Sequence, residues 1–163
     1  MISVVEATFE SPDGETFARE TVRHPGAVSV VPVVDDGNVV VVRQYRASVE
    51  RDLLEIPAGK RDVVGEPPAA TARRELVEEI GMRAGRLEQL AELFMTPGFS
   101  DEHMTIFMAL DLEACDAQAD GPEERHMSIE RIALDDVPTL IASGDIADAK
   151  TIVGLLLARQ ALS

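Results

Sequence analysis

One acidic segment, from Gly59 to Met82, constrains this sequence more than any other. Pro67 favours the first turn of a helix, because the N–H that proline lacks has no intrahelical partner there. Gly81 favours the end of that helix, since glycine adopts the left-handed conformation at little cost. The segment between them predicts an amphipathic helix. Its apolar arc consists of Ala69, Ala72, Leu76, Val77 and Ile80, and its polar arc of Arg74, Glu75, Glu78 and Glu79.

The polar arc places like charges one above another, because Glu78 and Glu79 follow Glu75 by three and four residues. Each such pair costs an isolated helix about 0.2–0.5 kcal/mol. A solvated helix face is one explanation. The other is a site for Mg²⁺ or Mn²⁺, which prefer hard oxygen ligands. The preceding loop fits the second explanation, since Gly59 and Gly65 allow the backbone to approach a ligand closely.

The rest of the sequence predicts strands and helices around this segment. A Ser11–Gly14 turn predicts a hairpin over residues 1–22. Apolar, β-branched runs predict strands over residues 27–34, 39–46, 53–59, 87–94, 104–110 and 129–134, the first two around a turn at 35–38. Because continuously apolar strands are usually covered on both faces, helices are expected on the sheet. Two are predicted, over 137–143 with Asp135 or Asp136 as cap, and over 148–162 with Ile152, Val153, Leu156 and Leu157 facing the core.

The charge of the chain excludes some partners. A formal net charge of −15 over 163 residues argues against general nucleic-acid binding and against acidic membranes. An anionic substrate therefore requires local cations, and Arg43 and Arg46 are candidates, although a pair of arginines is more often surface charge. The single Cys115, the acidic rather than basic residues 1–10 and the short apolar run 152–158 predict a cytoplasmic protein without a membrane span.

The pattern of Glu66, Arg74, Glu75, Glu78, Glu79 and Gly81 resembles the Nudix box, the signature of Nudix hydrolases. It departs from the box in one place, since six residues rather than five separate Gly59 from Glu66. The resemblance covers nearly the whole chain and is weakest over the first 22 residues. It implies an α/β chain with the Nudix fold, an α/β/α sandwich with a mixed sheet and an N-terminal β-hairpin. Residues 23–163 would form the hydrolase domain, and residues 1–22 a hairpin exchanged within a homodimer.

The resemblance also implies roles for the residues of the box. Glu75, Glu78, Glu79 and the carbonyl group of Ala58 match ligands of Mg²⁺, for which Mn²⁺ is an alternative. Gly59, Glu66, Arg74 and Gly81 match positions that shape the box, with Arg74 orienting the glutamates by ion pairing.

Further segments resemble the ADP-ribose branch of the family. Arg46 and Glu55 match substrate-binding positions, and the loop that contains Pro97 and Gly98 matches a loop of these enzymes. A loop glutamate is expected as the catalytic base. Glu124 is the first candidate, Glu123 the second and Glu130 a distant third.

The implied activity is Mg²⁺-dependent hydrolysis of ADP-ribose to AMP and ribose 5-phosphate. Another nucleotide sugar, NADH or an oxidised dNTP are alternative substrates, and a non-catalytic ADP-ribose sensor or a purely structural domain are alternative functions. Relatives stack adenine on an N-terminal aromatic residue, for which this chain offers Phe9 or Phe17.

Overall fold

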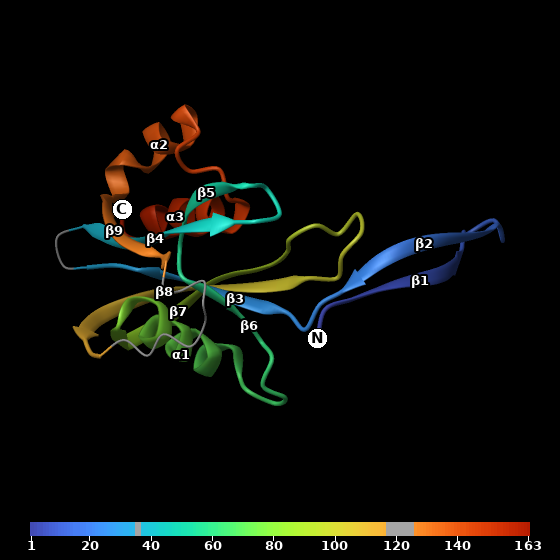
Figure 1. Ribbon diagram of the computed structural model, residues 1–163, viewed down its shortest axis with the longest axis horizontal. Helices are drawn as coiled ribbons and strands as arrows, with labels where there is room; N and C mark the ends of the chain where they lie inside the picture. Colours follow the sequence, from blue (N-terminus) through green and yellow to red (C-terminus); the bar gives the residue numbers. More distant parts are fainter. Residues whose placement is uncertain (35–36, 117–125) are drawn as a thin grey trace.

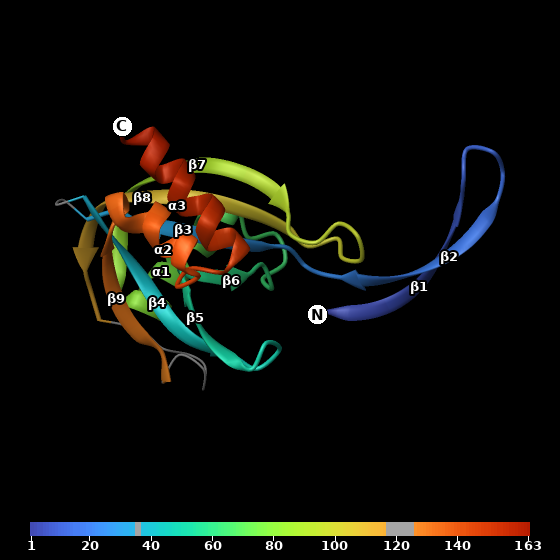
Figure 2. The same cartoon turned by 90° about the horizontal axis from the view of Figure 1, so that it is seen from above.

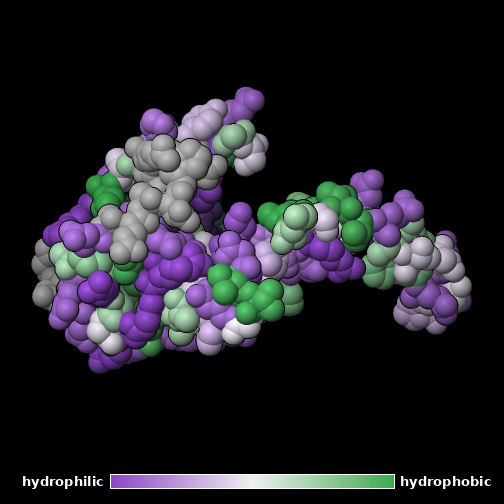
Figure 3. All heavy atoms as spheres, turned by 60° about the horizontal axis from the view of Figure 1, so that its bottom comes forward, coloured by the Kyte–Doolittle hydropathy of each residue, from purple (hydrophilic) through white to green (hydrophobic). Residues whose placement is uncertain are grey.

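The β-strands form two sheets and a separate hairpin in a computed structural model that describes residues 1–34, 37–116 and 126–163. The hairpin pairs β1 (Ser3–Glu10) with β2 (Thr16–Arg23) and extends away from the rest of the molecule (Figures 1 and 2). Its turn forms where the sequence predicts it, because the N–H of Gly14 donates to the carbonyl group of Ser11. The hairpin leaves Ile2, Val4 and Phe9 exposed, and Figure 3 shows apolar surface where it joins the sandwich.

The first sheet is mixed and has the order β6-β3-β8-β7. Its strands are β3 (Ala27–Pro32), β6 (Ala58–Lys60), β7 (Met82–Phe94) and β8 (His103–Ala114). Among the described strands of this sheet, β3 and β8 are parallel neighbours, whereas β3 with β6 and β7 with β8 pair antiparallel. Every residue of β3 is buried, as its continuous apolar run predicts, because side chains on both of its faces belong to core clusters.

The second sheet, of order β5-β4-β9, is antiparallel. It consists of β4 (Asn38–Arg46), β5 (Arg51–Glu55) and β9 (Ser128–Ala133). The strands predicted around the turn at 35–38 therefore lie in different sheets, and the described residues join them by a bridge between Val33 and Val39 and a hydrogen bond from the N–H of Val34 to the carbonyl group of Asn38. The strand predicted over 53–59 is also divided. The chain leaves β5 at Glu55, passes through Ile56 and Pro57, and enters the first sheet as β6.

Helices α1 (Pro68–Ile80) and α3 (Ala149–Ala161) lie on opposite sides of the first sheet (Figure 1). The predicted limits of α1 are confirmed. Pro67 is its N-cap, and the N–H of Gly81, at φ 62°, donates to the carbonyl groups of Leu76 and Val77. Ala72, Leu76 and Ile80 are buried against Val28 and Val30 of β3, whereas Ala69 is exposed.

The predicted core face of α3 is partly wrong. Leu156 is 42% exposed, whereas Gly154, Leu155 and Ala158 are buried. The reason is a close contact at Gly154, where a Cβ atom would lie 2.8 Å from Ile56 Cδ1 and 3.1 Å from a Val31 methyl group. Because α3 packs on the sheet at Gly154, Leu155 and Ala158 face the core and Leu156 faces away from it.

The two remaining helical segments are η2 (Leu134–Asp136) and α2 (Val137–Ser143). Asp136, one of the two predicted caps, is the N-cap residue of α2, but its side chain makes no cap hydrogen bond, and η2 leads directly into that helix. In α3 the N-cap residue is Asp148, and its side chain accepts a hydrogen bond from the N–H of Thr151. No helix within the described ranges is long and apolar enough to cross a membrane.

Candidate active site

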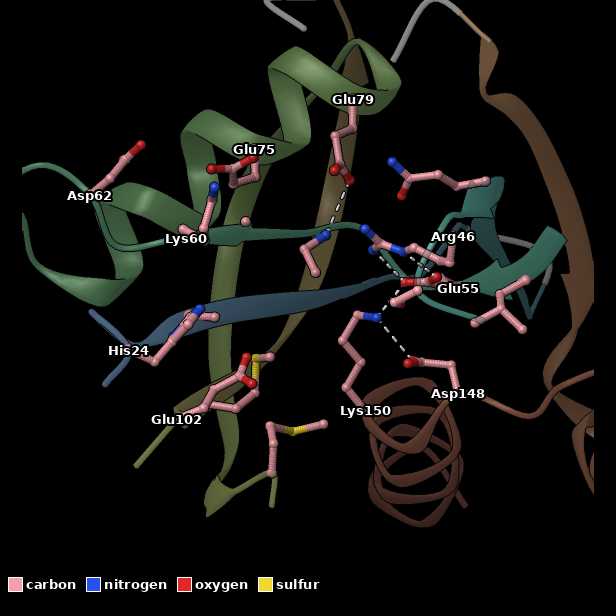
Figure 4. A pocket seen from close by; sticks show the side chains of 18 of the residues that line it. His24, Arg46, Glu55, Lys60, Asp62, Glu75, Glu79, Glu102, Asp148 and Lys150 are labelled. Atoms are coloured by element: carbon pink, nitrogen blue, oxygen red, sulfur yellow. Dashed lines mark hydrogen bonds and ion pairs between the residues drawn. The ribbon is translucent and has the colours of Figure 1, made fainter. Parts of the chain in front are cut away.

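A cleft of about 840 Å³ lies where the two sheets, α1 and the start of α3 meet (Figure 4). Side chains of α1 point into one side of it, and a second polar cluster from β4, β5 and α3 lies on the other side. Eight residues that the sequence singles out line this cleft: Arg46, Glu55, Ala58, Gly59, Arg74, Glu75, Glu78 and Glu79. Residues that are far apart in the sequence therefore share one cavity.

The polar arc of α1 faces the cleft, so the explanation as a solvated helix face is wrong. Glu75 is only 7% exposed, and Glu78 and Glu79 are half-buried. Burial raises the pKa of Glu75 to about 7, since loss of hydration outweighs the opposing charge of Arg74 and the negative charge of Glu78 adds to the effect. A carboxylate that is this poorly hydrated gains from a nearby cation.

Arg74 is the cation that the structure places there. Its Nη1 lies 2.9 Å from Glu75 Oε1 and 2.7 Å from Glu78 Oε2, and its Nη2 lies 3.6 Å from Glu66 Oε2. Glu66 also accepts a hydrogen bond of 2.8 Å from the hydroxyl group of Thr71 in the first turn of α1. The extra residue of the loop does not disturb this contact, because the loop turns through exposed Val64 and Gly65.

Strand β6 contacts two carboxylates of α1, those of Glu75 and Glu79. The N–H of Ala58 donates to Glu79 Oε2 at 3.1 Å. A Cβ atom on Gly59 would lie 1.9 Å from Glu75 Cδ, so only glycine leaves room for this carboxylate. Glu75 and Glu79 are therefore held against the backbone of two consecutive residues.

The donors of this cluster fit a divalent cation such as Mg²⁺ or Mn²⁺, because carboxylate and carbonyl oxygens are its preferred ligands and Glu75 lacks full hydration. Within residues 1–34, 37–116 and 126–163, no three Asp, Glu, His or Cys side chains are arranged to hold an ion as they stand. The carboxylates of Glu75 and Glu78 are instead directed at Arg74. An ion bound here would therefore share these two carboxylates with Arg74, which lies at one oxygen of each.

The second cluster of the cleft is centred on Glu55, which is 1% exposed. Arg46 Nε and Nη2 donate to its two carboxylate oxygens at 2.7 and 2.8 Å. Lys150 Nζ donates to Glu55 Oε2 as well and to Asp148 Oδ2 at 3.0 Å. Although burial alone would raise the pKa of Glu55, the hydrogen bonds from Arg46 and the charge of Lys150 hold it below its usual value. The guanidinium group of Arg46 reaches the cleft from this cluster.

Lys150 and Asp148 are functional candidates that the sequence motifs do not predict. A signal was present, since Lys150 is the cation at the start of a helix whose middle, residues 152–158, is apolar apart from Gly154. A lysine in such a place is either exposed or paired with buried acids, and only the folded chain shows which.

Some predicted residues lie elsewhere. Pro97 and Gly98 are exposed and do not line the cleft, although Met95 and Glu102 from the same loop do. This loop instead contacts the end of β2, where Asp101 accepts from Arg23 Nη1 at 3.0 Å.

Of the three candidates for the base, Glu130 lies within the described residues and does not line the cleft. Glu123 and Glu124 lie outside the residues that the structure describes. Glu130, on β9, is engaged by Arg43, whose Nε lies 2.6 Å from its Oε1. The two N-terminal aromatic candidates, Phe9 and Phe17, stack on each other in the hairpin, with their ring centroids 5.9 Å apart.

Comparison with known proteins gives a consistent result. Residues 23–153 match the NUDIX domain. The chain is 39% identical to an ADP-ribose pyrophosphatase of Bacillus subtilis over 142 residues, which cover 87% of this chain and 76% of the relative. It is 38% identical to a methanol dehydrogenase activator of Bacillus methanolicus over 146 residues, 90% of this chain and 78% of the relative.

A solved structure shares the fold. The crystal structure of an ADP compounds hydrolase superimposes with a TM-score of 0.86 at 28% identity, covering 99% of this chain and 91% of that one. The α/β sandwich with its mixed sheet is thus confirmed as a known fold. From the domain match and these relatives, the chain belongs to the NUDIX family.

Proposed function

We propose that this chain hydrolyses ADP-ribose to AMP and ribose 5-phosphate with Mg²⁺ as the metal ion. The observation that carries the proposal is one cleft that combines the poorly hydrated carboxylates of α1 with the guanidinium group of Arg46. The names of the Bacillus subtilis relative and of the similar solved structure support an ADP-containing substrate. Hydrolysis adds water across the pyrophosphate: the water oxygen bonds to one phosphorus, and the bond from that phosphorus to the bridging oxygen breaks.

Divalent-metal dependence is general among NUDIX hydrolases. In this chain Glu75, Glu78, Glu79 and the carbonyl group of Ala58 would hold the ion, with Mn²⁺ as an alternative to Mg²⁺. When bound, the metal neutralises pyrophosphate charge and lowers the pKa of a coordinated water.

The protein residues have separate tasks in this proposal. Arg46 binds a phosphate oxygen of the substrate, because an arginine still has unused N–H donors after a bidentate ion pair. Glu55, whose carboxylate is fully engaged, holds Arg46 rather than the substrate. Gly59 leaves the space that Glu75 occupies.

We assign the catalytic base to Glu124, with Glu123 as the alternative. Glutamates that hold a cation are weak bases, because the cation lowers their proton affinity. A carboxylate from the loop that joins β8 and β9 would accept the proton of the attacking water.

We also propose a cytoplasmic homodimer in which residues 1–22 reach the partner. Support comes from the exposed apolar side chains of the hairpin, Ile2, Val4 and Phe9, which the chain itself leaves uncovered. In such a dimer Phe9 or Phe17 is available to adenine. Light scattering at micromolar concentration tests the dimer, and a particle of 17.6 kDa, the mass of one chain, would contradict it.

A substrate panel tests the activity. ADP-ribose, a GDP-sugar, NADH and an oxidised dNTP are each incubated with Mg²⁺, with Mn²⁺ and with EDTA, and products are separated by chromatography. AMP and ribose 5-phosphate in equal amounts from ADP-ribose, lost in EDTA, are expected. A higher kcat/KM for another compound would identify that compound as the substrate instead of ADP-ribose. Binding of ADP-ribose without turnover would identify a sensor.

A further inference from the structure

A buried lysine at the start of α3 has no role in the function proposed so far. Lys150 is 7% exposed although it lies in the first turn of its helix. Burial of a charged side chain is costly unless acids pair with it. Its partners are Glu55 Oε2 and Asp148 Oδ2 (Figure 4). Asp148 in turn accepts hydrogen bonds from the N–H and the hydroxyl group of Thr151.

The same network ties α3 to the point where the chain crosses between the sheets. The hydroxyl group of Thr151 accepts a hydrogen bond of 3.0 Å from the N–H of Ile56, the residue after Glu55. Lys150 is therefore held beside Glu55 by backbone and side-chain contacts from both sides. These contacts fix the position of the Lys150 side chain in the cleft.

Charge explains what this arrangement does. Glu55 alone would cancel the charge of Arg46, because their two hydrogen bonds form a bidentate ion pair. Lys150 pairs with the same carboxylate, and its positive charge offsets the negative charge of Glu55. The group of Arg46, Glu55, Asp148 and Lys150 then carries no net charge, whereas without Lys150 it would carry one negative charge.

This difference matters because acids outnumber cations in the rest of the cleft. Of the described residues, two cations, Lys60 and Arg74, line it against five acids: Asp62, Glu75, Glu78, Glu79 and Glu102. The whole chain has a formal charge of −15. An anionic ligand approaching Arg46 depends on every positive charge nearby, since burial weakens the screening by water.

We propose that Lys150 is a positioning residue for an anionic substrate: it offsets the charge of Glu55, so that Arg46 keeps its attraction for a phosphate group. The identity of the ligand as a nucleoside diphosphate ester rests on the proposed function. A purely structural lysine would behave differently, because replacing a buried ion by an apolar side chain changes stability and not the affinity for an anion.

The test measures binding of an uncleavable analogue of ADP-ribose, with a methylene group between the phosphorus atoms, by calorimetry. Lys150→Met is expected to raise the Kd about tenfold, a loss of about 1.4 kcal/mol. For ADP-ribose itself KM rises by a similar factor with kcat within about threefold, the pattern of a lost uniform binding interaction. The matched control is Arg159→Met, which removes one positive charge from the exposed side of the same helix, where Arg159 is 44% exposed and faces Asp135. Its Kd should equal that of the parent.

A charge series separates the electrostatic role from a structural one. The double variant Asp148→Asn/Lys150→Met restores the parent's charge balance and keeps Glu55 on Arg46, so its Kd should return to within about threefold of the parent's. Asp148→Asn alone adds one positive charge, keeps an oxygen that can cap α3, and should bind at least as tightly as the parent, a comparison that holds even where Lys150→Met fails to fold. The proposal is overturned by an unchanged Kd in folded Lys150→Met, by a double variant as weak as Lys150→Met, or by a tenfold weaker Asp148→Asn.

Binding and turnover distinguish this inference from the proposed function. A parent protein that binds the analogue but does not hydrolyse ADP-ribose contradicts the activity and leaves the role of Lys150 standing. A parent that hydrolyses ADP-ribose, with a charge series that has no effect on Kd, contradicts only the role of Lys150.

Discussion

Replacing Gly59 by alanine should separate the chemistry of the cleft from the stability of the fold. The added Cβ atom would lie 1.9 Å from Glu75 Cδ and 2.0 Å from its Oε1. These atoms are roughly 1.5 Å closer than ordinary contact between non-bonded carbons, so the carboxyl group must move. The backbone itself accepts alanine, because Gly59 is not among the residues with positive φ.

The expected magnitudes follow from where the movement occurs. The displaced atoms form the end of a flexible side chain, so the cost to folding is that of a poor rotamer, about 0.5–1.5 kcal/mol. The cost to activity is larger, since ligand distances around a metal ion tolerate shifts of only about 0.2 Å. A misplacement of about 1 Å in an active site costs about 100-fold. We therefore expect kcat/KM for ADP-ribose to fall by about 100-fold or more, with a small change in Tm.

The measurement combines steady-state kinetics, a titration with Mg²⁺ and thermal unfolding. Gly144→Ala is the contrasting control, because Gly144 has φ 83° and open space around it. There the backbone bears the cost, about 1–2 kcal/mol, and turnover per folded molecule is unchanged. Gly59→Ala with kcat/KM within threefold of the parent and an unchanged Mg²⁺ midpoint would refute the reasoning.

Three further predictions concern the carboxylates. Glu79→Gln keeps an acceptor for the Ala58 N–H but loses the negative charge, so turnover should fall by orders of magnitude with the fold intact, and activity within twofold of the parent at saturating Mg²⁺ would contradict the assignment. Without metal, stability should decline as pH rises from about 5 to 7.5, because folded Glu75 keeps its proton up to about pH 7 whereas an unfolded glutamate, with a pKa of 4.5, loses it earlier. When Tm is measured across buffers, Glu75→Gln should lack the part of the decline that Glu75 causes. An equal pH dependence of Tm in both proteins would contradict this prediction. Glu124→Gln should lower kcat far more than KM while metal binding is kept; unchanged kcat in Glu123→Gln, Glu124→Gln and the double variant would mean that the base lies elsewhere.

The elements that the sequence predicts well are those that depend on neighbouring residues. Pro67 and Gly81 mark the ends of α1, because a missing N–H and a left-handed residue act within one turn of the helix. Pairing between distant strands has no such local signal. The segments on either side of residues 35–38 look like a hairpin, yet β3 pairs with β6 and β8, and β4 pairs with β5 and β9.

The residues of the candidate site likewise fall into those that local spacing predicts and those that depend on contacts between distant segments. The carboxylates of α1 share a helix face, so their spacing alone predicts that they lie together. The approach of Lys150 to Glu55 depends on how α3 packs at Gly154, and the apolar residues around that helix do not indicate which side faces inward. The exposed position of Pro97 follows from contacts of its loop with β2, which no pattern within the loop reveals.

The crossing at Ile56 and Pro57 has a consequence for redesign. It leaves Arg46 and Glu55 on one sheet and the box glutamates on α1, which packs against the other sheet. A library of variants at Gln44, Ser48 and Leu53, which line the cleft from the β4–β5 side, would vary the surface offered to the sugar or the base without touching the core beneath α1. Selection for new nucleotide substrates should therefore begin on that sheet, where the ligand preference of the cleft is separable from its hydrolytic machinery.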